Sequence, residues 1–159
     1  MHSTVIRKFV LFAALFFVAL VAGAAFAIWF DYNPNGMSAA FYTEKMQHAI
    51  RVFTTPLPAV VILGVLFTIL AAFLARYERP NFYLLIAASI CMVAVALITR
   101  FGNIPINNQI VAWSINSPPS NWQDLANKWW QLQTVRTLVA MGSLGFLILA
   151  ALARPSMSK

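Results

Sequence analysis

Four long runs of uncharged, mainly apolar residues dominate this sequence and restrict what the chain can fold into. The charged residues that bound them leave 22, 24, 20 and 17 uncharged positions in turn. A helix needs about 20 mainly apolar residues, with a range of roughly 17 to 25, to cross the hydrocarbon core of a membrane. All four runs meet this requirement. We therefore expect an all-α integral membrane four-helix bundle, a single domain over residues 1–159 with spans at about 9–30, 54–75, 81–100 and 136–153.

The composition excludes a soluble domain. Hydrophobic residues make up 61% of the chain and charged residues 9%, whereas soluble domains have roughly 45–50% and about 25%. The net charge of +7 is compatible with nucleic-acid binding. However, the chain has no arginine-rich run or basic aromatic surface to hold a phosphate backbone. We expect membrane lipids, including anionic headgroups, as partners and no nucleic acid.

The positions of the basic residues predict the orientation of the chain. Six of the eleven lie in the two terminal tails and the short connection at 76–81, and five are spread over the two long connections. Basic residues next to spans are enriched on the cytoplasmic side. This pattern predicts that both termini are cytoplasmic and that both long connections lie outside, in a multi-pass protein of a bacterial inner (plasma) membrane.

The first long connection carries a turn signal and a helix signal. The sequence Asn-Pro-Asn-Gly at 33–36 is typical of a turn. Ser38 is a suitable N-cap for a helix over residues 39–53. We expect a helical outer segment before the second span.

The second long connection is polar at first and becomes helical later. Residues 101–123 contain ten Asn, Gln or Ser residues and three prolines, which predicts a loop or surface segment because unpartnered amides are unfavourable in lipid. Asn103 could cap a short helix within it. Asn121 could cap a longer helix that continues into the fourth span, over about 122–153.

Small residues predict which helix faces pack together, since they let backbones approach closely where lipid provides no hydrophobic drive. They are Ala19, Gly23 and Ala27 in the first span, and Gly64, Thr68, Ala71 and Ala75 in the second.

Three ionisable residues share a face of the first outer helix: Glu44, His48 and Arg51, at positions i, i+4 and i+7. Glu44 and His48 have the spacing of two metal ligands, but two ligands do not make a site, and we expect no metal. Histidine takes up protons near neutral pH, so His48 could remove a proton from an acidic carbon or phenol. A plain surface pair at the level of the lipid headgroups is the third interpretation.

Polar residues around the fourth span suggest a site for an oxyanion. Arg136 could reach toward lipid headgroups, or it could stabilise an enolate or phenolate oxygen together with Gln133, Asn103 and Asn107. Tryptophans cluster in the same part of the sequence, as membrane-interface anchors or as the wall of a pocket for a lipophilic aromatic molecule. They are Trp113, Trp122, Trp129 and Trp130.

Several short motifs, taken in order, resemble those of the anthrone oxygenase-like family. That family consists of small four-helix membrane proteins, many known only as a domain of unknown function, and the resemblance covers most of the chain. The motifs are Val21-Ala22-Gly23, Lys45-Met46-Gln47-His48, Asn103-Ile104-Pro105-Ile106-Asn107, Trp129 and Thr134-Val135-Arg136-Thr137.

The resemblance implies an activity and a set of polar residues. Some fungal members oxidise anthrones to anthraquinones with molecular oxygen and without a bound cofactor. Gln133 stands where the family is expected to have a histidine or asparagine, which removes a second proton-transfer group. The positions that match the polar motifs are His48, Asn103, Asn107, Trp129 and Arg136.

Two functions follow from these observations. The first is a cofactor-independent oxygenase for a planar phenolic or quinol-like molecule, with His48 and Arg136 as catalytic residues. The second is a non-catalytic accessory subunit that packs against other membrane subunits. For the enzyme, the expected substrate-binding residues are Asn103, Asn107, Trp129, Trp130, Gln133 and Arg51.

Overall fold

The computed structural model describes residues 2–153, and within that range it is helical with no strand. Four stretches are long and apolar enough to cross a membrane: Thr4–Asp31, Pro56–Leu74, Arg79–Val111 and Trp122–Leu152. The predicted all-α architecture with four spans is therefore confirmed. The basic residues of the C-terminal tail, Arg154 and Lys159, lie outside the described residues. The helices, in chain order, are α1 (His2–Asp31), α2 (Ala39–Phe53), α3 (Pro56–Leu74), α4 (Arg79–Leu97), the π-helical turn η1 (Ile98–Asn103), α5 (Ile104–Val111) and α6 (Trp122–Leu152).

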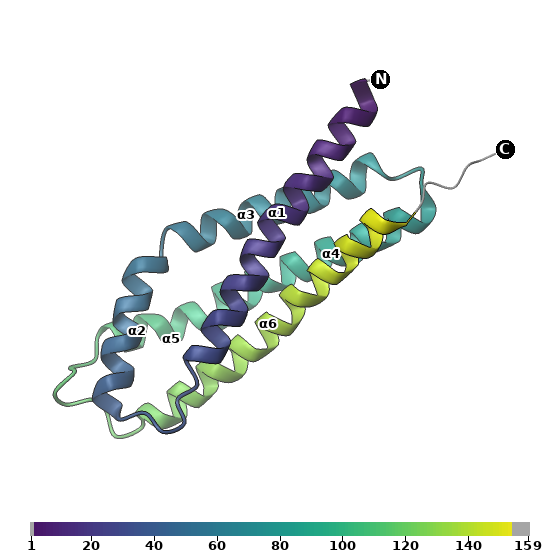
Figure 1. Ribbon diagram of the computed structural model, residues 1–159. Helices are drawn as coiled ribbons and strands as arrows, with labels where there is room; N and C mark the ends of the chain where they lie inside the picture. The colour runs from purple at the N-terminus through teal and green to yellow at the C-terminus, as the bar shows by residue number, and fades with distance from the viewer. Residues whose placement is uncertain (1, 154–159) are drawn as a thin grey trace.

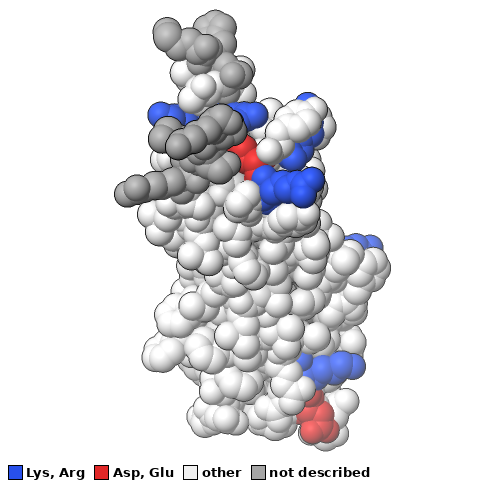
Figure 2. Space-filling view, turned by 90° about the vertical axis from the view of Figure 1, so that its right-hand side faces the viewer, with Lys and Arg blue, Asp and Glu red and all other residues white. Residues whose placement is uncertain are grey.

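The four long helices form an elongated bundle (Figure 1). Helix α1 packs against α3 and α6, and α4 packs against α3 and α6. Helices α2 and α5 and the first turns of α6 gather at one end, while the start of α1 and the end of α6 lie at the other (Figure 1). On the face in Figure 2, charged side chains gather near the top and along the lower right edge, and most of the remaining surface is uncharged. Both long connections thus lie at the same end of the bundle.

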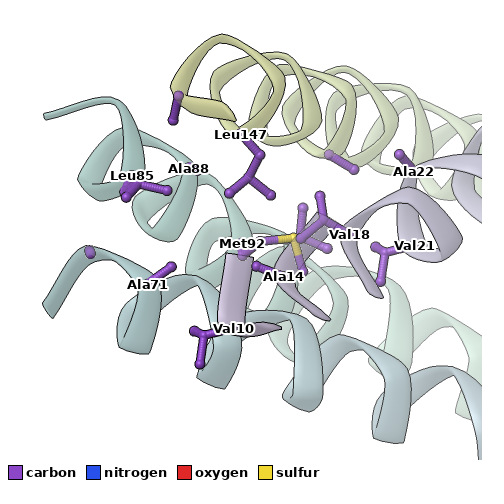
Figure 3. Close-up of a cluster of buried hydrophobic side chains, with 14 of the residues drawn as sticks. Val10, Ala14, Val18, Val21, Ala22, Ala71, Leu85, Ala88, Met92 and Leu147 are labelled. Carbon is purple, nitrogen blue, oxygen red and sulfur yellow. The ribbon is translucent and has the colours of Figure 1, made fainter. Parts of the chain in front are cut away.

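Small and aliphatic side chains fill the half of the bundle near the start of α1 and the end of α6. Figure 3 shows Met92 of α4 and Val18 of α1 pointing toward each other between the helices. Of the two predicted packing faces, the one on α3 is confirmed, because Gly64, Thr68, Ala71 and Ala75 are buried.

The predicted packing face on α1 is wrong. Ala19, Gly23 and Ala27 are exposed, and α1 packs instead through a stripe that includes Val18 and Ala22. Helix α1 is apolar on every side, so its sequence alone does not distinguish the face that meets α3 and α6 from the face turned outward.

The first outer connection folds as its sequence predicts. The N–H of Met37 donates to the carbonyl of Pro34 at 3.1 Å, and Gly36 has φ of +80°, a left-handed conformation that glycine adopts without strain. Ser38 caps α2, since its Oγ accepts from the N–H of Phe41 at 3.3 Å.

The second outer connection differs from the prediction at its start. Helix α4 does not end near residue 100 but continues through η1 and α5 to Val111. Within η1 the N–H of Ile104 donates to the carbonyl of Thr99, five residues earlier. Pro105 has no N–H to donate to the preceding turn, so the helix widens there instead of stopping. Asn103 accordingly makes no side-chain cap.

Helix α6 confirms the prediction of one long helix. It runs without a break from Trp122 to Leu152. The predicted cap at its start is not formed, because the side chain of Asn121 makes no capping hydrogen bond.

Candidate functional site

A cavity of about 470 Å³ lies in the half of the bundle that carries α2 and α5. Its wall is mostly apolar and comes from α1, α2, α3, α4, η1, α5 and α6. Binding sites for small molecules commonly enclose about 300 to 1,000 Å³ and place a few polar groups on an apolar wall. The polar side chains in the wall are Tyr32, Thr54, Thr99, Arg100, Asn103, Asn107, Asn108 and Arg136, together with the indole of Trp129.

Arg136 contributes a fixed cation to this cavity. One terminal nitrogen donates to Thr99 Oγ1 at 3.1 Å, and the other donates to Gln133 Oε1. The third nitrogen, Nε, is buried and has no hydrogen-bond partner. No carboxylate among the described residues forms an ion pair with Arg136. Buried cations are usually paired, so this guanidinium is suited to an anionic ligand.

Gln133 holds Arg136 in place. Its side chain is 0% exposed, and its Nε2 donates to the carbonyl of Ala25 on α1 at 2.9 Å. Its Oε1 accepts from Arg136. Gln133, predicted as a substrate-binding residue, is not part of the cavity wall. It contacts Arg136 and α1 instead.

Asn103, Asn107 and Trp129 meet on the cavity wall. The amide nitrogen of Asn103 donates to the carbonyl of Trp129 at 3.4 Å, while its Oδ1 is buried without a partner. The indole N–H of Trp129 donates to Asn107 Oδ1 at 2.7 Å. The structure therefore brings these three residues and Arg136 together at one cavity.

Trp130 lies outside the cavity wall. Its indole N–H donates to the carbonyl of Trp29 at 3.1 Å, and the two indoles stack with ring centroids 6.4 Å apart. Trp130 thus joins α6 to α1.

His48 and Arg51 are exposed on the outer face of α2, and neither belongs to the cavity wall. The opposite face of α2 faces the cavity with Met46, Ala49 and Ile50. The structure therefore does not bring His48 together with Arg136. Within residues 2–153 no group of three or more His, Cys, Asp or Glu side chains could hold a metal ion.

Gln47, which is outside the cavity wall, fixes α2 to the end of α5. Its Nε2 lies 3.0 Å from the carbonyl of Ile110 and 2.9 Å from that of Trp113. Gln47 was not among the predicted site residues. Its neighbours on α2 include Thr43, Glu44 and His48, so no sequence pattern indicated that the packing of α2 would bury it.

Thr99 and Tyr32 were also missed. Thr99 precedes Asn103 by four residues, as Asn103 precedes Asn107, so a helical reading of this segment would have found it. Tyr32 had no such signal. Burial, together with the negative charge of Asp31, raises the pKa of the Tyr32 phenol, so this side chain is a neutral hydrogen-bond donor around neutral pH.

These features define a small helical protein with four membrane-length helices and a ligand-sized cavity that contains one fixed arginine. The anthrone oxygenase family model matches residues 45–146, and the chain belongs to this family. The match runs from α2 into α6 and includes every predicted site residue. No curated protein and no solved structure matches the chain.

Proposed function

We propose that this protein binds a planar, lipophilic phenolic or quinol-like molecule in the cavity and oxidises it with molecular oxygen, without a bound cofactor. The observation that carries the proposal is the guanidinium of Arg136, which has no carboxylate partner among the described residues and belongs to a mostly apolar cavity wall. An apolar wall suits the rings of such a molecule, and a cationic donor suits its oxygen. Membership of the anthrone oxygenase family supports an anthrone as the first substrate to test.

The oxidation of an anthrone balances without a cofactor. Loss of one proton from the methylene carbon gives an anion whose charge is shared with the ketone oxygen. Arg136 stabilises that oxygen, and the electron-rich carbon reduces oxygen. Two C–H bonds break and one C=O bond forms, so the carbon loses four electrons. Oxygen gains four, with one atom kept in the product and the other released as water.

The first proton has two possible acceptors. His48 remains the proposed base and, being exposed on α2, would act through water. Alternatively, Arg136 lowers the energy of the anion enough for the proton to pass directly to solvent. The variant His48→Ala separates these routes. A loss of roughly 10²- to 10⁴-fold in rate assigns the proton to His48, and an unchanged rate removes His48 from the mechanism.

The experiment uses the full-length chain in lipid nanodiscs with anthrone as substrate. Oxygen uptake is followed with an electrode and quinone formation by absorbance, each against empty nanodiscs to correct for spontaneous oxidation. We expect saturable oxygen uptake with one oxygen consumed per quinone formed. Uptake equal to that of empty nanodiscs would contradict the proposal.

We further propose that the cavity lies at the outer surface of a bacterial inner membrane, with both termini in the cytoplasm. Arg7, Arg76 and Arg79 belong to the end of the bundle that carries the chain ends, which supports this orientation. Single cysteines placed at Asn116 and Tyr77 in a Cys91→Ser background test it. An impermeant thiol reagent added to intact cells should label the first position and spare the second; the opposite result would reverse the orientation.

The packing of the tryptophans favours a binding function over an accessory subunit. All five are buried or half-buried, and they contact their own chain, as in the pairs Trp29–Trp130 and Tyr42–Trp122. Purification in mild detergent checks this point. Stable co-purification with other membrane subunits would favour the accessory role.

A further inference from the structure

The wall of the cavity has an exposed edge where α2 ends and α3 begins. Four wall side chains there are exposed: Phe53, Thr54, Pro58 and Ile62. Pro58 and Ile62 are four residues apart and therefore share one face of α3. We call these four residues the first edge.

A second edge runs along η1 and α5. Arg100 and Asn108 are exposed wall residues, and Ile104 between them is half-buried. Their spacing of four residues places all three on one helix face. Every other residue of the wall is buried or half-buried, so the cavity meets its surroundings between the first and the second edge.

The other sides of the cavity are closed by packing and hydrogen bonds. Toward the outer connections, Met46 belongs both to the wall and to a buried core that includes Tyr42 and Ile110. Side-chain hydrogen bonds join α6 to α1 and to η1. In the described part of the chain, no hydrogen bond joins residues 53–62 to residues 95–108.

The two edges lie apart because α3 approaches its neighbour only farther along its length. Met92 of α4 lies against Gly64 of α3. Helix α3 packs against α1 and α4, but it does not pack extensively against η1 or α5. Figure 1 accordingly shows the start of α3 standing apart from α5.

The first edge lies at the depth of the lipid. Helix α3 has 19 residues, which gives a length of about 28 Å at ~1.5 Å per residue, and the hydrocarbon core is ~30 Å thick. Nearly the whole of α3 is therefore needed to cross the membrane. Pro58 and Ile62, in its first two turns, lie in the hydrocarbon, while Arg100 on the second edge can extend toward the headgroups.

We propose that the cavity opens sideways into the membrane between these two edges, and that its ligand enters from the lipid and not from water. The proposal rests on the cavity being the ligand site of the proposed function, and it adds the route to that site. Lipophilic molecules concentrate in the hydrocarbon of a membrane, so entry from the side spares them a passage through water.

The test measures access to a thiol inside the cavity with two reagents that share one reactive group. Ala49→Cys in a Cys91→Ser background places the thiol on the cavity wall. Benzyl methanethiosulfonate dissolves in lipid, whereas its trimethylammonioethyl counterpart stays in water. Both are added to the full-length chain in lipid nanodiscs, and each rate is divided by the rate for Asn116→Cys, at an exposed position of the outer connection. On this scale we expect the benzyl reagent to react roughly tenfold faster or more, because a cation is costly to move into an apolar space.

Two pairs of variants locate the route. Ile62→Trp narrows the opening and should slow the benzyl reagent roughly fivefold or more. Leu66→Trp is the matched control, since Ile62 is 58% exposed and Leu66 57%, one turn apart on α3, but Leu66 is outside the cavity wall. Phe53→Ala widens the opening and should raise the rate. Its control, Val52→Ala, changes the neighbouring exposed residue, which is also outside the wall.

Three results would contradict the proposal. They are equal relative rates for the two reagents, no reaction of Ala49→Cys with either, and rates in Ile62→Trp and Phe53→Ala that match those of their controls. The reagent comparison and Phe53→Ala decide the matter even where Ile62→Trp fails to fold. Because thiol modification is measured and not turnover, a chain that meets these expectations but consumes no oxygen with anthrone would support the opening and contradict the proposed oxidation.

Discussion

The two halves of this bundle are packed in different ways, although the same long helices run through both. Near the chain ends, the core consists of small and aliphatic side chains such as Ala14, Val18, Ala88 and Met92. At the other end, large side chains such as Tyr42, Met46 and Trp129 form the core. The first half brings the helices close together, and the second half contains the cavity of about 470 Å³.

The difference in packing explains why only one half of the bundle contains the cavity of about 470 Å³. Where small residues face each other, helices approach until little room is left. At Gly64 the end of the Met92 side chain fills the space that a larger residue would need, since a Cβ there would lie 2.9 Å from Cε of Met92. In the other half, hydrogen bonds from Gln133 to α1 and from Arg136 to Thr99 fix the helices at a distance that side chains do not fill.

The largest expected effect comes from the cation of the cavity. Arg136→Gln removes the charge that stabilises the substrate oxygen, and we expect kcat/KM for anthrone oxidation to fall about 10²- to 10³-fold. Oxygen-uptake kinetics measure this. Arg79→Gln, at the start of α4 near the chain ends, is the control and should retain full activity. A loss of less than about threefold in Arg136→Gln would show that the cavity half does not depend on its cation.

The next prediction compares a larger side chain in the tightly packed half with the same enlargement at the cavity. Ala88 is 0% exposed in the tightly packed half, so Ala88→Leu overfills the core and should lower the free energy of unfolding by about 1 to 3 kcal/mol. Ala49→Leu adds the same atoms to the cavity wall and should leave stability nearly unchanged while weakening ligand binding. Denaturant titration in detergent measures both. Equal destabilisation by the two variants would contradict the difference between the halves.

A smaller effect is expected from the residue that positions Arg136. Gln133→Leu removes the acceptor for one guanidinium nitrogen and the hydrogen bond to α1. A hydrogen bond to a charged group contributes roughly 1.5 to 3 kcal/mol at most, and part of it is recovered by water, so we expect about a tenfold lower kcat/KM. The loss should fall on kcat more than on KM, because Gln133 acts on the substrate only by positioning Arg136.

The smallest effect concerns Tyr42, whose hydroxyl is buried without a partner. Tyr42→Phe removes that hydroxyl and should leave the free energy of unfolding unchanged or raise it by about 1 kcal/mol at neutral pH.

Tyr42 also predicts a dependence on pH. Burial raises the pKa of its phenol in the folded chain. The unfolded chain therefore releases this proton first, and stability falls as the pH rises above about 10, the ordinary value for tyrosine. Unfolding measured from pH 8 to 11 should show this loss in the parent chain and less of it in Tyr42→Phe. An identical alkaline profile in both would show that Tyr42 does not control it.

Much of the fold follows from local sequence patterns. The lengths of the apolar runs predicted four spans, and the Asn-Pro-Asn-Gly turn and the Ser38 cap were confirmed. The absence of Gly and Pro from Trp122 to Met141, followed by the fourth apolar run, predicted α6. These features depend on neighbours within a few residues along the chain, so a single sequence contains the information that determines them.

The tertiary structure decided what the sequence left open. Asn103, Asn107, Trp129 and Arg136 were recognised as polar residues near span ends, but only the packing of η1 against α6 placed them on one cavity wall. The rotation of α2 about its own axis placed His48 outside that wall.

The helix positions and the number of spans were determined by the sequence itself. The distribution of apolar and charged residues along the chain sets where helices form and which of them are long enough to cross a membrane. The packing faces of α1 and α2, the widened turn at η1 and the unpartnered atoms of Asn103 and Arg136 were decided only by tertiary structure. Those features depend on contacts between residues far apart in the chain, and an apolar helix gives little indication of which side its neighbours occupy.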